Sequence, residues 1–190
     1  MSEAAPRGKL TIGRLGAADV LDKGGFRLSS AAFDDGDELD PCFTADEEDS
    51  VAPPLEWTAP PPGAMELALV VEDADAPGAE PFCHWLVWGL APQAGKLLEG
   101  ETPPRTGKNA HGNSEWLLPA PPVGSGPHAY VFQLFALDLP LALMPGASRD
   151  DLEAAMKGHV LASAVITGTY QRNEDGDDFV GDWDESDDID

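Results

Sequence analysis

Three runs of apolar residues of strand length stand out along the chain, and each is flanked by proline, glycine or aspartate. They are residues 65–71 (MELALVV), 84–90 (HWLVWGL) and 130–137 (YVFQLFAL). An almost continuous apolar run of this length is typical of a strand that is covered on both faces of its sheet. The pattern therefore predicts three buried central strands.

Weaker patterns predict further elements around these strands. Residues 10–12, 26–28 and 164–170 are shorter strand candidates. Ser148 and Asp151 form the S-x-x-D pattern of a helix-capping box, and Gly158 is a plausible helix stop. Between them, apolar residues recur at helical spacing: Leu152, Ala155 and Met156. Together the patterns predict a mainly antiparallel sheet protein with one or two small helices.

Composition and charge add the domain organisation. A chain of 190 residues with 18 prolines and 20 glycines fits one domain of short strands and many loops, which we place at residues 1–172. Nine acidic residues and no lysine or arginine lie at 34–49, which predicts an exposed, mobile acidic loop at about 34–50. Ten more follow from residue 174, which predicts a disordered acidic tail at 173–190.

The charge and the apolar segments also exclude several classes of function. A formal net charge of −24 is the opposite of what binding to nucleic acid or to an anionic membrane surface requires. The longest aliphatic run, residues 67–71, is too short to cross a bilayer, and the first ten residues lack the apolar core of a secretory signal. We therefore expect a cytoplasmic location, no nucleic-acid partner and no transmembrane segment. Cys42 and Cys83 are expected to be reduced thiols.

Acidic and imidazole side chains follow the first central run and open the second. Asp73 and Asp75 come directly after residues 65–71, and His84 begins the next run only nine positions later. A contact between one carboxylate and His84 would orient the imidazole and favour its charged form. The alternative for the two aspartates is a simple Asx turn before Pro77, and the alternative for His84 is a structural hydrogen bond.

A second histidine follows a loop rich in proline. Residues 119–122 read PAPP, and His128 comes just before the third apolar run. A proline-rich loop is rigid, so it can hold backbone N–H groups and a histidine toward a cavity with little loss of entropy on binding. The alternative is a tight connector that leaves His128 exposed.

Five segments give the chain a specific resemblance to the phosphatidylethanolamine-binding protein family, and most closely to its bacterial Raf kinase inhibitor-like members of the YbhB/YbcL type. In chain order they are PPLEW (53–57), LALVVEDADAP (67–77), HWLVW (84–88), PPVGSGPHAY (121–130) and GHVLASAVITGTYQR (158–172). The combination of DxDAP, HW and PP…HxY is far more specific than any single piece.

The resemblance implies an antiparallel β-sandwich built on a large central sheet, with a small pocket for phosphate-like anions such as phosphoethanolamine head groups. It implies no catalytic chemistry and no cofactor. Carried over by motif, the ligand-binding residues are Asp73, Asp75, Pro77, His84, Pro121, Pro122, His128 and Tyr130.

Two positions depart from the family's pattern. Ala129 stands where an arginine is usual, which would remove a bidentate partner for an anion. Leu118 stands where a glycine is usual, which would narrow the pocket or change the loop backbone.

Three functional hypotheses follow. In the first, His84 and His128 donate hydrogen bonds to a small anion while Asp73 and Asp75 orient them. In the second, the same four residues hold a divalent ion in a metal-assisted hydrolase. In the third, the protein inhibits a kinase or protease or acts as a regulatory scaffold, with the acidic tail either docking a basic partner or only keeping the protein soluble. The oligomeric state stays open, with a homodimer as one alternative.

Overall fold

The structure, a computed structural model, describes residues 7–174 and is built on one central sheet. Its four antiparallel strands have the order β4-β3-β6-β7. They are β3 (Glu66–Asp73), β4 (Phe82–Leu90), β6 (His128–Leu137) and β7 (Val160–Tyr170). The three predicted central strands are therefore confirmed as the neighbours β4, β3 and β6, and residues 164–170 form the main part of β7.

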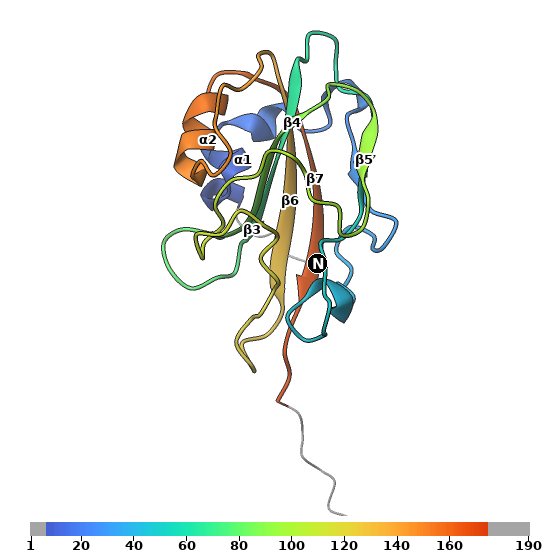
Figure 1. Ribbon diagram of the computed structural model, residues 1–190, viewed down its shortest axis with the longest axis vertical. Helices are drawn as coiled ribbons and strands as arrows, with labels where there is room; N and C mark the ends of the chain where they lie inside the picture. Colours follow the sequence, from blue (N-terminus) through green and yellow to red (C-terminus); the bar gives the residue numbers. More distant parts are fainter. Residues whose placement is uncertain (1–6, 175–190) are drawn as a thin grey trace, which may run out of the picture.

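A second, smaller antiparallel sheet packs on one side of the central sheet (Figure 1). It has the order β1-β2-β5 and consists of β1 (Leu28–Ser29), β2 (Leu55–Trp57) and β5 (Gly95–Leu97). Two antiparallel sheets packed around a common core form the β-sandwich that the sequence predicts.

Two short α-helices cover the other face of the central sheet (Figure 1). They are α1 (Thr11–Arg14) and α2 (Arg149–Met156), and short 3₁₀ turns complete the helical content: Arg7–Lys9, Ala17–Val20, Lys23–Gly25 and Pro41–Phe43. The predicted capping box of α2 is present, because Ser148 and Asp151 exchange side-chain and backbone hydrogen bonds. The prediction of a strand at residues 10–12 is wrong, since this segment enters α1.

Both faces of the central sheet are buried, which explains why its strands are apolar at nearly every position. On β3, Leu67, Leu69 and Val71 point into the core between the sheets, while Ala68 and Val70 point into the core under the helices. The same alternation of faces follows from the two-residue period of every strand. The two cores together hold the sheet rigid.

One buried carboxylate links the N-terminal segment and α2 to the central sheet. Glu72 is fully buried and accepts hydrogen bonds from the backbone N–H of Thr11 and the side-chain amide of Gln133. Its other oxygen lies 2.9 Å from Nη1 of Arg149 and 3.5 Å from Nη2 of Arg14. Because its partners come from the N-terminal segment, the central sheet and α2, Glu72 has a structural role: it holds these three segments together and is not part of an open site.

The acidic loop at about 34–50 is exposed at its carboxylates, as expected, but its backbone is anchored to the edge of β7. The N–H of Leu39 donates to the carbonyl of Thr169, the N–H of Thr169 donates to the carbonyl of Asp37, and Leu39 and Phe43 are buried. These contacts attach the loop to the sheet edge, and the expected mobility of the loop stays a prediction.

Within residues 7–174 no helix is long and apolar enough to span a membrane. The predicted acidic tail, residues 173–190, falls almost entirely outside the described residues. The two cysteines are free thiols.

Candidate functional site

The strand order explains how three separated segments meet at one end of the central sheet. Strand β3 lies between β4 and β6 and runs antiparallel to both, so its last residue faces the first residues of its neighbours. Asp73 is opposite Phe82 on β4 and opposite Tyr130 on β6. The DxDAP, HW and HxY segments therefore share one sheet end.

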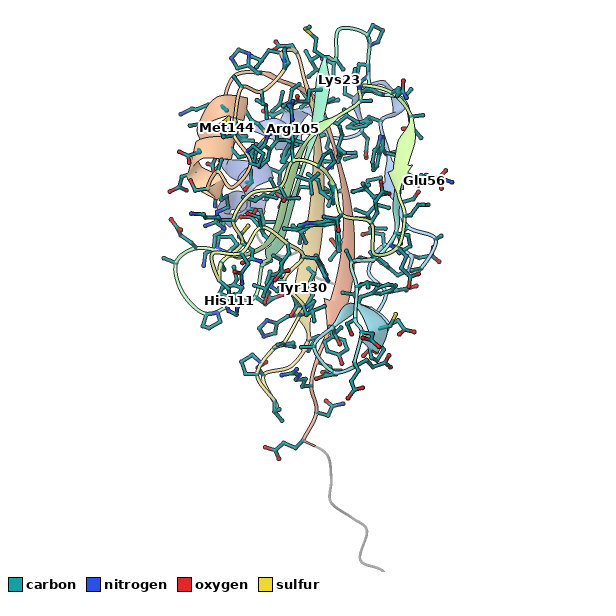
Figure 2. All side chains as sticks on the ribbon, viewed as in Figure 1. Lys23, Glu56, Arg105, His111, Tyr130 and Met144 are labelled. Atoms are coloured by element: carbon teal, nitrogen blue, oxygen red, sulfur yellow. The ribbon has the colours of Figure 1, made fainter. Side chains whose placement is uncertain are left out.

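A cavity of about 290 Å³ opens at this end. Figure 2 shows Tyr130 near the lower end of β6 and His111 in a neighbouring loop, and both line the cavity. The remaining lining residues are Asp73, Ala76, Pro77, Phe82, His84, Leu117, Leu118, Ala120, Pro121, Pro122 and His128. Seven of the eight residues predicted from the sequence thus line one cavity, and Asp75 does not.

His128 is held from both sides of its ring. Nδ1 lies 2.7 Å from Oδ2 of Asp73, and Nε2 lies 3.1 Å from Oγ of Ser125, whose hydroxyl also lies 2.8 Å from the carbonyl of Pro122. Both His128 and Asp73 are 5% exposed. If the Ser125 hydroxyl donates to the carbonyl of Pro122, its oxygen can only accept a hydrogen bond from Nε2 of His128. In that arrangement Nδ1 donates to Asp73 and Nε2 donates to Ser125, so both ring nitrogens carry a hydrogen and the ring is the charged imidazolium.

Asp75 plays a different part from the one expected. Its side chain is exposed, and Oδ2 accepts a 2.7 Å hydrogen bond from the backbone N–H of Ala129. Its own N–H donates to Oδ1 of Asp73 at 2.9 Å, which is the Asx turn considered from the sequence. Asp75 therefore orients no histidine. It braces the turn that holds Asp73 in place.

His84 makes no contact with either aspartate that would orient it. Its Nδ1 lies 2.6 Å from the carbonyl of Leu117, so Nδ1 carries the hydrogen, while Nε2 has no hydrogen-bond partner among the described residues. Edge-on aromatic contacts surround the ring, with centroids 5.1 Å away at Tyr130 and 5.5 Å away at Phe82. This burial lowers the pKa of His84 below its usual value near 6.5.

The hydroxyl of Tyr130 is a further polar group at the cavity. The residue lines the cavity, and the hydroxyl makes no hydrogen bond with the described part of the chain. Burial, together with the negative charge of Asp73, raises the pKa of Tyr130 well above its usual value. The phenol therefore keeps its proton at neutral pH and can donate a hydrogen bond to a ligand.

Several residues of the site were not predicted from the sequence. Phe82, His111, Leu117 and Ser125 carry no motif of their own. Phe82 comes to the site as the first residue of β4, and the loops before β6 bring the other three. Only Ser125 had a usable signal, because it lies three residues before His128 inside the motif segment at 121–130.

The two departures from the family's pattern have clear positions. Leu118 lines the cavity and does not have a positive φ, so the loop backbone here does not need glycine. Leu118 was expected either to narrow the pocket or to change the loop backbone. Its position agrees with the first of these, because its side chain is part of the pocket wall. Ala129 does not line the cavity, because it lies between His128 and Tyr130 on β6 and neighbouring side chains of a strand point to opposite faces. The expected loss of an anion contact at Ala129 stays a prediction, which an arginine at this position would test.

The metal-hydrolase hypothesis fails on geometry. Across residues 7–174 no three His, Cys, Asp or Glu side chains are grouped so that they could hold a metal ion. Of the four proposed ligands, Asp75 is bonded to a backbone N–H, and one ring nitrogen of His84 is bonded to a carbonyl. The four donors do not converge on a point.

The fold and the site thus define a β-sandwich protein with a small cavity built from an aspartate, two buried histidines and a tyrosine at one end of its central sheet. Residues 29–171 match the family model described as phosphatidylethanolamine-binding protein. This chain belongs to that family.

The relatives agree with this assignment. A protein named UPF0098 from Methanothermobacter thermautotrophicus is 38% identical over 155 residues, which cover 76% of this chain and 98% of the relative. A phosphatidylethanolamine-binding protein homologue from Chlamydia trachomatis, CT736, has a crystal structure with a TM-score of 0.72 and 32% identity, covering 77% of this chain and 97% of that one. YbcL from E. coli has the same fold, with a TM-score of 0.70 and 24% identity over 77% of this chain and 98% of its own.

Proposed function

We propose that the protein binds a small oxyanion, a phosphate or phosphate monoester group, in the cavity between Asp73, His84, His128 and Tyr130. The single observation that supports this proposal most directly is the convergence of two imidazoles and a protonated phenol on one cavity of about 290 Å³. Oxyanions are recognised by such sets of hydrogen-bond donors, and the bonds are stronger when the donor is charged.

Each of the three side chains can donate a hydrogen bond to an anion in one of its protonation states. The Tyr130 hydroxyl is a donor at neutral pH. In its charged form His128 donates from Nε2, and an arriving anion replaces Ser125 as the acceptor. His84 donates from Nε2 once it takes up a proton, since Nδ1 is already bonded to Leu117. Asp73 faces His128, so its negative charge is opposed by a ring that can be positive.

The overall charge limits the affinity. A chain of formal net charge −24 repels anions at long range, and this repulsion is screened over about 10 Å at 0.1 M salt. The local donors act against this field. We therefore propose a modest affinity for a free anion, with faster binding as salt is added.

Isothermal titration calorimetry with phosphoethanolamine at pH 6 tests the proposal. His128→Gln replaces a ring that can be positively charged with a neutral amide, and Tyr130→Phe removes a hydroxyl donor, so each is expected to weaken binding at least tenfold. His159→Gln is the matched control, because His159 also pairs with an aspartate, Asp138, at 2.8 Å but on an exposed surface away from the cavity. Equal affinity in all four proteins would overturn the proposal.

We further propose that the site binds its ligand without turning it over. Asp73, His128 and Ser125 form a hydrogen-bonded chain that resembles a hydrolytic triad, but Ser125 lies outside the cavity lining and its hydroxyl also contacts the carbonyl of Pro122. A fluorophosphonate probe, which labels activated serines, is expected to leave Ser125 unmodified by mass spectrometry. A stoichiometric adduct at Ser125 would show an activated nucleophile instead.

A further inference from the structure

A second, larger cavity adjoins the site, and its walls are partly the same residues. It has a volume of about 520 Å³. Four residues line both cavities: His111, Leu117, Leu118 and Ala120. The shared walls place the two cavities next to each other, as a smaller and a larger compartment. The larger one exceeds the smaller in volume and lies in the range of pockets that hold small organic molecules, whereas the smaller is at the lower limit of that range.

Aromatic side chains form the fixed part of the larger compartment. Trp85 and Trp116 both line it, and their rings meet edge-on with centroids 5.7 Å apart. Trp116 is further held by stacking on Phe132 and by a hydrogen bond from Nε1 to the carbonyl of Phe43. Its ring centroid lies 6.1 Å from that of His84, which lines the smaller cavity. The indole of Trp116 therefore lies close to both compartments.

Charge distinguishes the two compartments. Two acidic residues, Glu101 and Glu115, are among the residues that line the larger one, and neither lining contains a lysine or an arginine. The smaller one contains His84 and His128, and its single carboxylate, Asp73, is bonded to His128. An anionic group is therefore favoured in the smaller compartment and disfavoured in the larger one.

We infer that the ligand of this protein is a phosphate monoester with an uncharged aromatic or otherwise apolar group, and that this group occupies the larger compartment against Trp116 and Leu118. This inference rests on the proposed function, because the phosphate occupies the proposed anion site. The inference adds that a bare anion fills only the smaller of the two compartments. Apolar area removed from water at Trp116 and Leu118 then supplies affinity that the oxyanion alone lacks.

Two phosphate monoesters that differ only in their apolar group test the inference in the full-length protein. By calorimetry at pH 6, 1-naphthyl phosphate is expected to bind at least about tenfold more tightly than methyl phosphate, as burial of an aromatic group predicts. Phosphocholine carries a cationic group in place of the aromatic one. If phosphocholine binds more tightly than 1-naphthyl phosphate, the inference is overturned in favour of a ligand with a cationic group near Glu101 and Glu115.

A substitution in the larger compartment locates the effect. Thr102 lines only that compartment and is exposed, so Thr102→Trp should fill it without disturbing the core. We expect this variant to lose most of the preference for 1-naphthyl phosphate and to keep the affinity for methyl phosphate. Ala32→Trp adds the same indole at an exposed position outside both cavities and should change neither affinity.

The outcomes separate the two proposals. Binding of neither monoester would overturn the proposed function and the inference with it. If 1-naphthyl phosphate and methyl phosphate bind equally well, and both lose affinity in His128→Gln, the result would support the anion site and overturn the apolar compartment. A preference for 1-naphthyl phosphate that survives Thr102→Trp would also overturn the inference, because the naphthyl group would then lie elsewhere.

Discussion

Nδ1 of His128 lies 2.7 Å from Oδ2 of Asp73, although the two residues are 55 positions apart in the chain. The contact exists because β6 pairs with β3 and brings the start of one strand to the end of the other. It sets the orientation of the imidazole before any ligand arrives, and a preoriented donor costs less entropy on binding.

Asp73→Asn tests the importance of this contact. The amide cannot stabilise a positive imidazolium as a carboxylate does, so we expect phosphoethanolamine to bind at least about tenfold more weakly at pH 6. Asp75→Asn makes the same chemical change at an exposed carboxylate outside the cavity, and its affinity should stay within about twofold of the original. Calorimetry measures both. A larger loss in the Asp75 variant would contradict the roles assigned here.

Anion binding should depend on pH through His84. Burial lowers the pKa of His84, the hydrogen bond to Leu117 and the charge of Asp73 raise it, and the neighbouring His111 and His128 lower it. The net direction is downward, so the ring is neutral at pH 7, with its hydrogen on Nδ1 and none on Nε2. A bound anion favours the charged ring, so binding takes up a proton and tightens as pH falls through and below about 6.5.

Sulfate is the suitable probe, because its charge is constant between about pH 5 and about pH 8, the range in which histidine titrates. We expect its affinity to rise toward lower pH with a slope approaching tenfold per pH unit. His84→Gln should reduce that slope. An affinity for sulfate that stays level across this range would contradict the role of His84 as a donor.

An arginine at position 129, as the family resemblance implies, should leave anion binding unchanged. Ala129 is outside the cavity lining, and its backbone N–H is bonded to the exposed carboxylate of Asp75. In Ala129→Arg we expect the guanidinium to pair with Asp75 at the surface, with a change in the free energy of unfolding of about 1 kcal/mol or less. Calorimetry should find the phosphoethanolamine affinity within about twofold. A tenfold gain would show that position 129 reaches the ligand.

The buried carboxylate of Glu72 should be important for stability and not for binding. Glu72→Gln removes the buried charge that opposes Arg149 and Arg14, which leaves each arginine with only a more exposed carboxylate partner, Glu80 or Glu153. We expect a loss of about 3–5 kcal/mol in the free energy of unfolding, measured by urea denaturation. Glu80→Gln also removes a partner of Arg149, but at an exposed side chain, so its effect should be below about 1 kcal/mol. Similar losses in the two variants would contradict this account.

The sequence predicts the central sheet well, because strands buried on both faces leave continuous apolar runs at 65–71, 84–90 and 130–137. It predicts the small sheet and α1 poorly. Strand β1 has two residues and α1 has four, and elements this short are determined by packing against the sheet more than by any periodic pattern.

The candidate site was predictable as a set of residues but not as a set of contacts. Seven motif residues do line one cavity, yet the pairing of Asp73 with His128 and of His84 with Leu117 depends on strand register and on a loop whose course no local pattern reveals. The sequence also does not reveal how the acidic loop is anchored, because Leu39 and Phe43 are isolated apolar residues among nine acidic ones.

Other expectations from the sequence stay predictions. They are the cytoplasmic location, the disorder of the acidic tail, the oligomeric state and a role as an inhibitor or scaffold for a protein partner. Each concerns either residues outside 7–174 or a molecule other than this chain.

The central claim is that the cavity at the end of β3 binds a small oxyanion through its histidines, and NMR tests it most directly. Backbone amide and histidine ring signals are recorded while phosphoethanolamine is added at pH 6. We predict saturable shifts at the residues that line the cavity and at their chain neighbours: 73–77, His84, His111, 117–122 and 125–130. Shifts that are absent at millimolar ligand, or that centre on another surface, would contradict the claim.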